Sequence, residues 1–396
     1  MTKEAHFSSE FKETALFAPP ALIARLEQLD KGPKNRGALA EEIARLSEAY
    51  TRDRGELGAA SSAPGGLRAR LRFFLPRDLP KAGKPLLEAA SRGLLPSGAR
   101  LRVLDLGAGL GTTSLSLLRV LHLLGDEREV EIMAIDQDPG ALEHARALLS
   151  GKIEGFAAPS KVRIEAGDLF ESLKRDPVQG ERFDLILIGL ALNELRDREG
   201  ILKELMNCLS DGGLILIIEP ALREESRALM SLRDAIARGD ELEILGPCFH
   251  RAPCPLLERK RDWCHDSLSG EHPEAIAALA EAAGLRASRP TFSWLLLRRS
   301  ARAGEAAADQ PEALSDELSE RARGRIVSHH LASKGKLEFQ LCDERGELIT
   351  LRRLDRSRSK DDTRFDELGR GARVELSGER KKHALLIDKT SEIKRI

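Results

Sequence analysis

The stretch "LDLGAGLGTTS" at residues 104–114 decides how the rest of the chain is interpreted. An aliphatic run leads directly into three glycines at alternate positions, Gly107, Gly109 and Gly111, and a helical stretch follows. A glycine-rich turn between a strand and a helix lets a ligand approach the backbone and the N-terminus of the helix. The stretch therefore predicts a strand, turn and helix that bind a ligand.

Short aliphatic runs alternate with helical stretches on both sides of this turn. The runs are "LRVLDLG", "EIMAIDQ", "KVRIEAGD", "FDLILIGLA", "GGLILIIEP" and "TFSWLLLRRS". Strands separated by helices require crossover connections, which are typical of a parallel sheet covered on both faces. The fold class expected is α/β, with a doubly wound, mainly parallel, Rossmann-like sheet.

Changes in composition predict four segments along the chain. Helical spacing of apolar residues between 20 and 50, followed by the Gly-, Ser- and Pro-rich "RDRGELGAASSAPGG", indicates a helical N-terminal region and linker. Five short runs near the end, from "RGRIVSHH" to "HALLIDK", indicate a small β domain, with the OB-fold as one candidate. The segments are 1–64 (helical region and linker), 65–300 (α/β domain with a cysteine-rich insert at 246–266), 301–322 (linker) and 323–396 (β domain).

Composition excludes a membrane-spanning chain. Of the 396 residues 41% are hydrophobic and 32% charged, and no apolar run approaches the roughly 20 residues that a bilayer requires. The start, "MTKEAHFSSEFKE", lacks the pattern of a signal peptide. An odd number of cysteines, five, argues for a reducing compartment and against a disulfide framework. A cytoplasmic location without a membrane partner is therefore expected.

The net charge of −1 hides an asymmetry. From Arg321 onward there are 20 Lys and Arg against 13 Asp and Glu, which leaves 43 against 51 in the first 320 residues. A basic C-terminal part favours a polyanion partner, RNA and not DNA in this case, although a solvated charged face is the alternative. A second basic stretch, "RARLRFFLPRDLPKAGKP" at 68–85, makes Arg68, Arg70 and Arg72 candidate RNA contacts, while Phe73 and Phe74 are expected in the core.

Three acids follow three successive strands of the predicted sheet. Asp105 lies two residues before the first glycine, Asp136 ends the next strand and Asp168 ends the third. Each alone is commonly a helix cap, but together they converge on the crevice where open α/β sheets bind ligands. A dinucleotide site has no reason to place a carboxylate before the glycines, whereas a cationic sulfonium ligand benefits from one.

These motifs resemble those of the class I S-adenosylmethionine-dependent methyltransferases, over about residues 95–300. The resemblance implies that Asp105 and the glycines line the methionine side of the cofactor, that Asp136 holds the ribose and that Asp168 holds the adenine. Asn193 and Glu194, in "LALNELRD" after the fourth strand, stand where such enzymes often place substrate-facing residues. The Asn-Pro-Pro-aromatic motif and a Pro-Cys at this strand end are both missing, so the acceptor atom is left open.

Cys248, Cys254 and Cys264 lie within 17 residues, in the polar stretch "GPCFHRAPCPLLERKRDWCH". This clustering favours a metal site over buried small hydrophobic side chains, although the spacings match neither a zinc ribbon nor a radical enzyme. The fourth ligand is predicted to be Cys342, in "FQLCDERGE", and the alternative is a histidine that would complete a Cys3His zinc site. Cys208 follows helical spacing and is expected in the core.

The chain also resembles the methyltransferase-like proteins of the mitochondrial small ribosomal subunit and their bacterial relatives, over roughly 65–375. The matching stretches are "DLGAGLGT", "LALNEL", "GPCFHRAPCPL", "DWCH" and "GRIVSHHLASKGKLEFQLCDERGEL". The resemblance implies that the four cysteines bind a [4Fe–4S] cluster and that the protein associates with small-subunit rRNA during assembly. Relatives tend to have "CPH" where this chain has "CFH", and a Trp-Gly-Asp segment where it has "FDELGR".

The function expected is a small-subunit assembly factor that binds S-adenosylmethionine and rRNA and methylates that rRNA. Two alternatives remain open at the level of sequence. One is a non-catalytic RNA-binding assembly factor with a vestigial cofactor pocket. The other is a methyltransferase for a small molecule or a protein, with a zinc site that serves stability.

Overall fold

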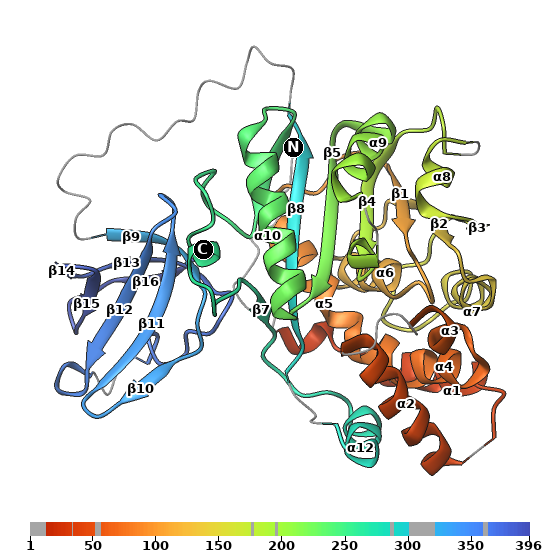
Figure 1. The fold of residues 1–396 in the computed structure, drawn as a ribbon, viewed down its shortest axis with the longest axis horizontal. Coiled ribbons are helices and arrows are strands. Elements are labelled where there is room, and N and C mark those ends of the chain that lie inside the picture. Colours follow the sequence, from red (N-terminus) through yellow and green to blue (C-terminus); the bar gives the residue numbers. More distant parts are fainter. Residues whose placement is uncertain are drawn as a thin grey trace. The chain divides into compact units, whose positions relative to one another are not determined.

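The computed structural model describes residues 13–33, 35–51, 57–175, 178–194, 197–285, 289–300, 321–358 and 363–396 (Figure 1). Contacts within the chain define two compact units. Unit 1 comprises Met1–Ile218 and Leu268–Pro290, and unit 2 comprises Glu219–Ser267 and Thr291–Ile396. The cysteine-rich insert and the C-terminal β domain therefore share one unit. Most of the predicted linker 301–322 lies outside the described residues, and the predicted four-segment division stays a prediction.

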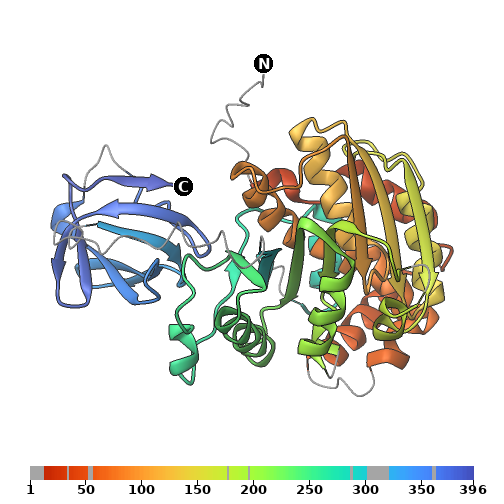
Figure 2. The same cartoon turned by 90° about the horizontal axis from the view of Figure 1, so that it is seen from above.

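Unit 1 is built on parallel strands in the order β3-β2-β1-β4-β5. The strands are β1 (Arg100–Leu106), β2 (Glu129–Asp136), β3 (Lys161–Ala166), β4 (Phe183–Gly189) and β5 (Leu209–Pro220). The central aliphatic residues of β1, β2, β4 and β5 are buried because helices cover both faces of the sheet, whereas those of the edge strand β3 are only partly buried (Figures 1 and 2). The strand order reverses between β1 and β4, which places a ligand crevice at the carboxyl ends of these strands. The predicted α/β fold class is confirmed.

The helices of unit 1 include the predicted helical N-terminal region. They are α1 (Pro20–Leu29), α2 (Arg36–Thr51), α3 (Leu57–Ser62), α4 (Pro64–Ala69), α5 (Leu75–Ser91), α6 (Thr112–Leu124), α7 (Pro139–Leu149), α8 (Leu169–Leu173), α9 (Arg198–Cys208) and α12 (Glu274–Ala282). Short 3-10 turns cover Glu13–Leu16 and Leu192–Glu194, and a π-helical turn, Arg70–Phe74, joins α4 to α5. Phe73 and Phe74 are buried in a core shared with α2 and α12, as predicted. No helix among the described residues combines the length and apolar composition that crossing a membrane requires.

Unit 2 begins with a helix and three antiparallel strands. Its elements before the β domain are α10 (Arg223–Arg238), β6 (Leu242–Gly246), α11 (Pro255–Glu258), β7 (Asp266–Ser267) and β8 (Thr291–Arg299). Strand β8 pairs with β6 and β7, both antiparallel. The insert runs from the end of β6 to β7, so the hydrogen bonds of these two strands to β8 hold both of its ends.

The β domain of unit 2, called the barrel below, has the connectivity of an OB-fold. Its strands are β9 (Arg321–Ile326), β10 (Leu331–Ser333), β11 (Lys336–Asp343), β12 (Leu348–Leu354), β13 (Arg373–Ser377), β14 (Glu379–Lys381), β15 (Ala384–Ile387) and β16 (Ile393–Arg395), and a 3-10 turn covers Asp355–Ser357. Around the barrel the strands pair in the order β9-β11-β12-β15-β14, and β12 and β15 are parallel. Strand β14 follows β13 directly in the chain, and β13 pairs with β9, which closes the ring. The five predicted strands are all present.

A substitution of Gly324 in β9 tests how tightly the barrel is packed. A Cβ atom at this position would lie 2.1 Å from the carbonyl oxygen of Cys342. Because the backbone of a paired strand cannot move aside freely, we expect Gly324→Ala to destabilise the barrel by about 3 kcal/mol. Gly369→Ala is the matched control, since a Cβ atom there meets nothing within 4 Å. Hydrogen exchange of the barrel amides measures the effect, and equal protection in the two variants would contradict this packing.

Candidate functional site

The glycine turn of unit 1 is held in a backbone conformation that few other residues adopt. Gly107, Gly109 and Gly111 have φ values of 74°, 52° and 80°. A Cβ atom on Gly107 would lie 2.4 Å from the Cβ atom of Ala191, which belongs to the loop after β4. Glycine is therefore required here both by the left-handed backbone and by the close approach of the two loops. The turn and the loop that carries Asn193 and Glu194 are neighbours.

Asp105 is fully buried beneath the turn at the end of β1. Its Oδ2 accepts hydrogen bonds from the Ser114 hydroxyl at 2.6 Å and the Ser114 amide at 3.1 Å. Its Oδ1 is buried without a hydrogen-bond partner in the described protein. Burial raises the pKa of Asp105 to about 6, against the opposing hydrogen bonds from Ser114. A buried carboxylate oxygen with no protein partner is costly, which is typical of a group that meets a ligand.

Asp136, at the end of β2, fastens the turn. Its Oδ2 accepts the Gly109 amide at 2.8 Å and its Oδ1 accepts the Asp138 amide at 2.9 Å. Asp138 in turn forms an ion pair with Arg70 at 2.7 Å. The Arg70 Nη2 atom would lie 2.8 Å from a Cβ atom on Gly109, so this guanidinium lies directly against the glycine turn.

The remaining predicted residues of unit 1 lie nearer the surface. Asp168 is exposed and caps α8, with its Oδ1 accepting the amides of Phe170 and Glu171 at 3.0 Å each. Asn193 is half-buried and Glu194 is exposed, both in the 3-10 turn after β4. Leu190, which precedes them, has a φ of 61°, an uncommon and strained value for this residue type.

The three arginines predicted to contact RNA form ion pairs within unit 1. Arg68 donates to Asp30 at 2.9 Å, and Arg72 donates to Asp30 at 2.9 Å and to Glu27 at 2.8 Å. Arg70 pairs with Asp138, as described above. Their role in RNA binding stays a prediction, and these pairs give each of the three a partner inside the protein.

The four cysteines predicted to bind a metal come together in unit 2, although Cys342 follows Cys264 by 78 positions. Every pair among the four sulfurs lies close enough to interact electrostatically. Burial raises the pKa of each thiol, and that of Cys254 reaches about 11. Cys208, the fifth, is buried in α9 of unit 1 with its thiol near the Leu205 carbonyl at 3.3 Å, as predicted for a core residue.

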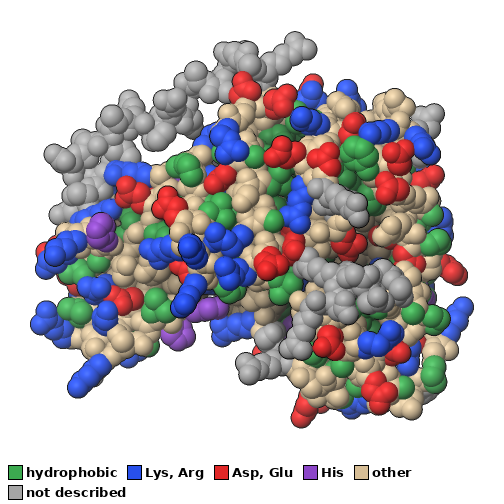
Figure 3. All heavy atoms as spheres, in the orientation of Figure 1, with side chains coloured by type: hydrophobic (Ala, Val, Ile, Leu, Met, Phe, Trp, Pro, Cys, Tyr) green, Lys and Arg blue, Asp and Glu red, His purple; other side chains and the backbone are tan. Residues whose placement is uncertain are grey.

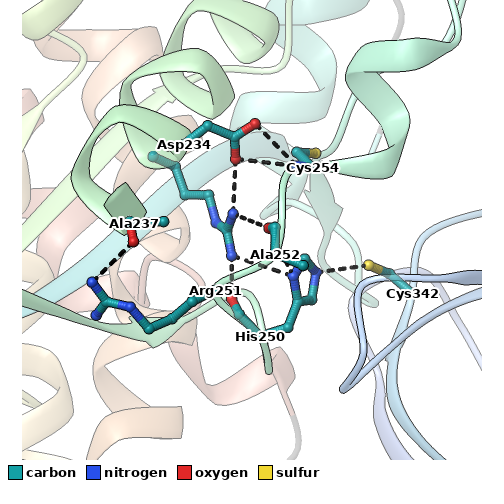
Figure 4. A network of polar contacts seen from close by, with 8 residues as sticks. Asp234, Ala237, His250, Arg251, Ala252, Cys254 and Cys342 are labelled. Atoms are coloured by element: carbon teal, nitrogen blue, oxygen red, sulfur yellow. Dashed lines mark hydrogen bonds and ion pairs between the residues drawn. The ribbon is translucent and has the colours of Figure 1, made fainter. Parts of the chain in front are cut away.

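A polar network includes Cys254 of the insert and Cys342 of the barrel (Figure 4). The fully buried Arg233 of α10 donates to Asp234 at 2.7 Å and to the Ala252 carbonyl at 2.5 Å, and also reaches the His250 carbonyl. Asp234 accepts the Cys254 amide at 3.0 Å, and His250 Nε2 lies 3.3 Å from Cys342 Sγ. Burial lowers the pKa of His250 to about 4, so the imidazole is neutral at physiological pH. The helix α10 thus fixes the backbone that carries the first two cysteines.

Arg325 of β9 connects the barrel to both ends of the insert. It pairs with Asp266 at 3.0 Å and donates to the Pro247 carbonyl at 2.9 Å and to the Gly371 carbonyl at 2.7 Å. Both Arg325 and Asp266 are buried. Because Pro247 precedes Cys248, and Arg325 lies opposite Cys342 in the β9-β11 ladder, this guanidinium helps to hold the insert near the fourth cysteine.

Phe249, which follows the first cysteine of the insert, packs against the barrel. The guanidinium groups of Arg323 and Arg373 lie 5.6 and 4.9 Å from the centre of its ring. Such cation–π contacts add attraction beyond simple burial. Phe249 therefore contributes a contact between insert and barrel.

In the described part of the chain, no three His, Cys, Asp or Glu side chains are arranged to hold a single metal ion together. The sequence also gave no indication of several residues that shape the site. Arg233, Asp266 and Arg325 are ordinary charged residues in the sequence, and only their burial and pairing reveal a role.

The fold and the glycine turn define a methyltransferase-like protein of class I. The family model described as "Mitochondrial small ribosomal subunit Rsm22" matches residues 91–359, which are 269 of the 396 residues. The chain belongs to this family. Its predicted cytoplasmic location stays a prediction.

Curated relatives match a smaller part of the chain. A carboxy-S-adenosyl-L-methionine synthase of Shewanella piezotolerans is 25% identical over 135 residues, 34% of this chain and 50% of that protein. Ajmaline N-methyltransferase of Rauvolfia serpentina is 25% identical over 154 residues, 39% of this chain and 47% of that protein. The chain thus spans about half the length of the curated relatives that it matches.

Two solved structures are similar at low identity. The plantazolicin methyltransferase BpumL in complex with SAH is 14% identical with a TM-score of 0.35, covering 71% of this chain and 99% of that one. Magnesium protoporphyrin IX methyltransferase from Synechocystis PCC 6803 with bound SAM is 13% identical with a TM-score of 0.32, covering 57% and 84%.

Substitution of Asp266 tests whether its ion pair with Arg325 holds the insert to the barrel. Asp266→Ala leaves a buried guanidinium without its carboxylate, and we expect a loss of about 3–5 kcal/mol in the free energy of unfolding of unit 2. Glu243→Ala is the control, because the Glu243–Arg298 pair is 43% and 35% exposed and contributes about 1 kcal/mol or less. Both tryptophans of the chain, Trp263 and Trp294, lie in unit 2, so their fluorescence during urea unfolding reports on this unit. Equal losses in the two variants would contradict the role given to Arg325.

Proposed function

We propose that this protein is an assembly factor of the small ribosomal subunit that binds S-adenosylmethionine in unit 1 and methylates rRNA. The observation that carries the cofactor assignment is the buried Asp105, which has one carboxylate oxygen without a protein partner beside a turn of three left-handed glycines. Membership of the Rsm22 family supports the ribosomal partner. The excess of basic residues in the barrel supports an RNA substrate.

The residues of unit 1 fit the cofactor by charge and by position. When bound, S-adenosylmethionine supplies an electrophilic methyl group on a cationic sulfonium. Asp105 would balance that charge from below the turn, and Asp136 would accept the ribose hydroxyls. Asp168 makes both of its cap bonds through Oδ1, which leaves Oδ2 for the adenine amino group.

Asn193 and Glu194 would face the acceptor. They follow β4 in the loop that contacts the glycine turn, so a nucleophile held there would approach the methyl group from outside the sheet. Methyl transfer depends largely on positioning and on exclusion of water, so these side chains would orient the acceptor.

A specific observation favours the second candidate function, a non-catalytic assembly factor. Arg70 lies against Gly109 and is held there by Asp138. A cofactor bound against the glycine turn would have to fit beside this guanidinium. In this alternative the pocket would be vestigial and the protein would act by binding RNA alone.

We further propose that Cys248, Cys254, Cys264 and Cys342 hold a [4Fe–4S] cluster. Four neighbouring thiols, of which those of Cys254 and Cys264 are buried and those of Cys248 and Cys342 partly buried, form a suitable donor set, since thiolates are the usual ligands of such clusters. In such a cluster each of the four thiolates would bind one iron. The buried Arg233 and Arg325 would offset the negative charge of the ligands. The alternative is one zinc ion.

The cofactor assignment predicts a specific loss of binding. Asp136→Ala removes an acceptor for the ribose hydroxyls and should weaken S-adenosylmethionine binding by about 1.5–3 kcal/mol, at least tenfold in Kd, measured by calorimetry. Asp211→Ala, an exposed acid of β5 in the same unit, should leave Kd unchanged. An intact protein that binds no S-adenosylmethionine at millimolar concentration would leave only the non-catalytic function.

Transfer of tritium from labelled S-adenosylmethionine to purified small ribosomal subunits then separates the two candidates. Label in the rRNA supports the enzyme. Cofactor binding without any label in rRNA contradicts methylation and supports the assembly factor that does not catalyse transfer.

The cluster assignment predicts colour. Protein purified without oxygen should be brown, with broad absorbance at about 400 nm. Cys264→Ser and Cys342→Ser should each abolish this absorbance, because each removes one thiolate, whereas Cys208→Ser should keep it. A colourless protein with one zinc per chain would contradict the iron assignment.

A further inference from the structure

The OB connectivity of the barrel indicates which of its faces is built to bind. Proteins of this fold use the outer face of the second and third strands, together with the loops between strands one and two and between strands four and five. In this barrel those strands are β11 and β12. Because Phe339, Leu341, Ile349 and Leu351 fill the core, the alternate side chains of β11 and β12 point outward.

One end of this outer face is already occupied. Cys342 lies on it at the end of β11, where His250 of the insert approaches within 3.3 Å. Further along the face, Gln340 donates to the Thr350 hydroxyl at 3.0 Å, and Arg352 and Lys336 share Glu338 at 2.5 and 2.7 Å. The part formed by Lys336, Glu338 and Gln340 of β11 and by Thr350 and Arg352 of β12 is called the open face below.

Two hairpin tips flank the open face. The tip of the β10-β11 hairpin lies beside the end of β12, since Asp355 donates its amide to the Gly335 carbonyl at 3.0 Å. The tip of the β14-β15 hairpin lies beside the start of β12, since Thr350 donates its amide to the His383 carbonyl at 3.0 Å. The two contacts are five residues apart along β12, or about 17 Å.

Positive charge gathers on the open face and its two tips. The basic residues are Lys334, Lys336, Arg352, Arg356, Lys381 and Lys382, and the acids are Glu338, Asp355 and Glu379. Lys334, Arg356 and Lys382 are exposed and form no ion pair with any residue that the structure describes. Figure 3 shows Lys and Arg side chains spread over the barrel, at the left of the view. Lys382 also has a φ of 56°, a left-handed conformation that is uncommon for lysine.

The described part of the open face has no Phe, Tyr or Trp on which a base could stack, and the exposed imidazole of His383 lies on one of its two tips. From Arg321 to the end of the sequence the only Phe, Tyr or Trp residues are Phe339 and Phe365, and both are buried in the core of the barrel. Proteins that bind single strands through this fold combine a basic groove with exposed aromatic rings, whereas duplex RNA is recognised mostly by its backbone and shape. A basic face without Phe, Tyr or Trp, and with one imidazole on a tip, favours the duplex.

We infer that the open face binds an RNA double helix through its phosphates, with Lys334 and Lys382 as contacts on the two tips. The inference rests on the proposed function for the choice of RNA as the partner, and it adds the surface and the form of the RNA. Phosphate contacts carry no base information, so binding through this face is independent of sequence.

The test compares two pairs of substitutions in the full-length protein purified without oxygen. Lys334→Gln/Lys382→Gln changes the open face, and Lys152→Gln/Lys203→Gln makes the same change in charge at two exposed lysines of unit 1. The probes are a fluorescein-labelled RNA duplex of about 16 base pairs and a single strand of the same length, followed by anisotropy over a range of salt concentrations.

We expect the wild-type protein to bind the duplex more tightly than the single strand. The open-face variant should lose on the order of tenfold in affinity at 0.1 M salt, and its slope of log K against log salt should shrink by about 1.5–2, because two phosphate contacts are lost. The control variant should retain both affinity and slope. Tighter binding of the single strand, or equal losses in the two variants, would overturn the inference but leave RNA as the partner. No binding of either RNA by the wild-type protein would instead refute the RNA part of the proposed function.

Discussion

The arrangement of unit 2 depends on one buried guanidinium. Arg325 extends from β9 of the barrel to Asp266 at one end of the insert and to the Pro247 carbonyl at the other. A buried ion pair of this kind stabilises little by itself, but removal of either partner is costly because the other charge remains desolvated. The insert therefore cannot leave the barrel without exposing the pair or breaking it. The meeting of Cys342 with the three cysteines of the insert follows from this constraint.

Burial of the four thiols has an electrostatic consequence. Desolvation raises the pKa of every one of them, and their mutual repulsion opposes ionisation further. They can act together as thiolates only when a cationic centre compensates their charge, which a metal cluster does. Arg233 and Arg325 supply part of that compensation in advance. A cluster would thus add free energy of folding to an arrangement that the protein's own ion pairs already favour.

Local patterns in the sequence were sufficient to predict the sheet of unit 1, the glycine turn, five strands of the barrel and the set of four cysteines. Each depends on residues close together in the chain, or on a residue type rare enough to stand out. The short strands β10, β14 and β16 were not predicted, because three residues carry too little pattern. The partners of Arg68, Arg70 and Arg72 could not be predicted either: Arg68 meets Asp30 across 38 positions and Arg70 meets Asp138 across 68. A basic stretch looks the same in sequence whether its charges face RNA or pair internally.

The proposed iron–sulfur centre would join the insert to the barrel through four sulfurs. Crystals grown without oxygen and measured with X-rays on both sides of the iron absorption edge would show whether it is there. We expect one compact iron signal enclosed by Cys248, Cys254, Cys264 and Cys342, and none near Cys208. Four free thiols at these positions, or a signal that appears only at the zinc edge, would contradict it.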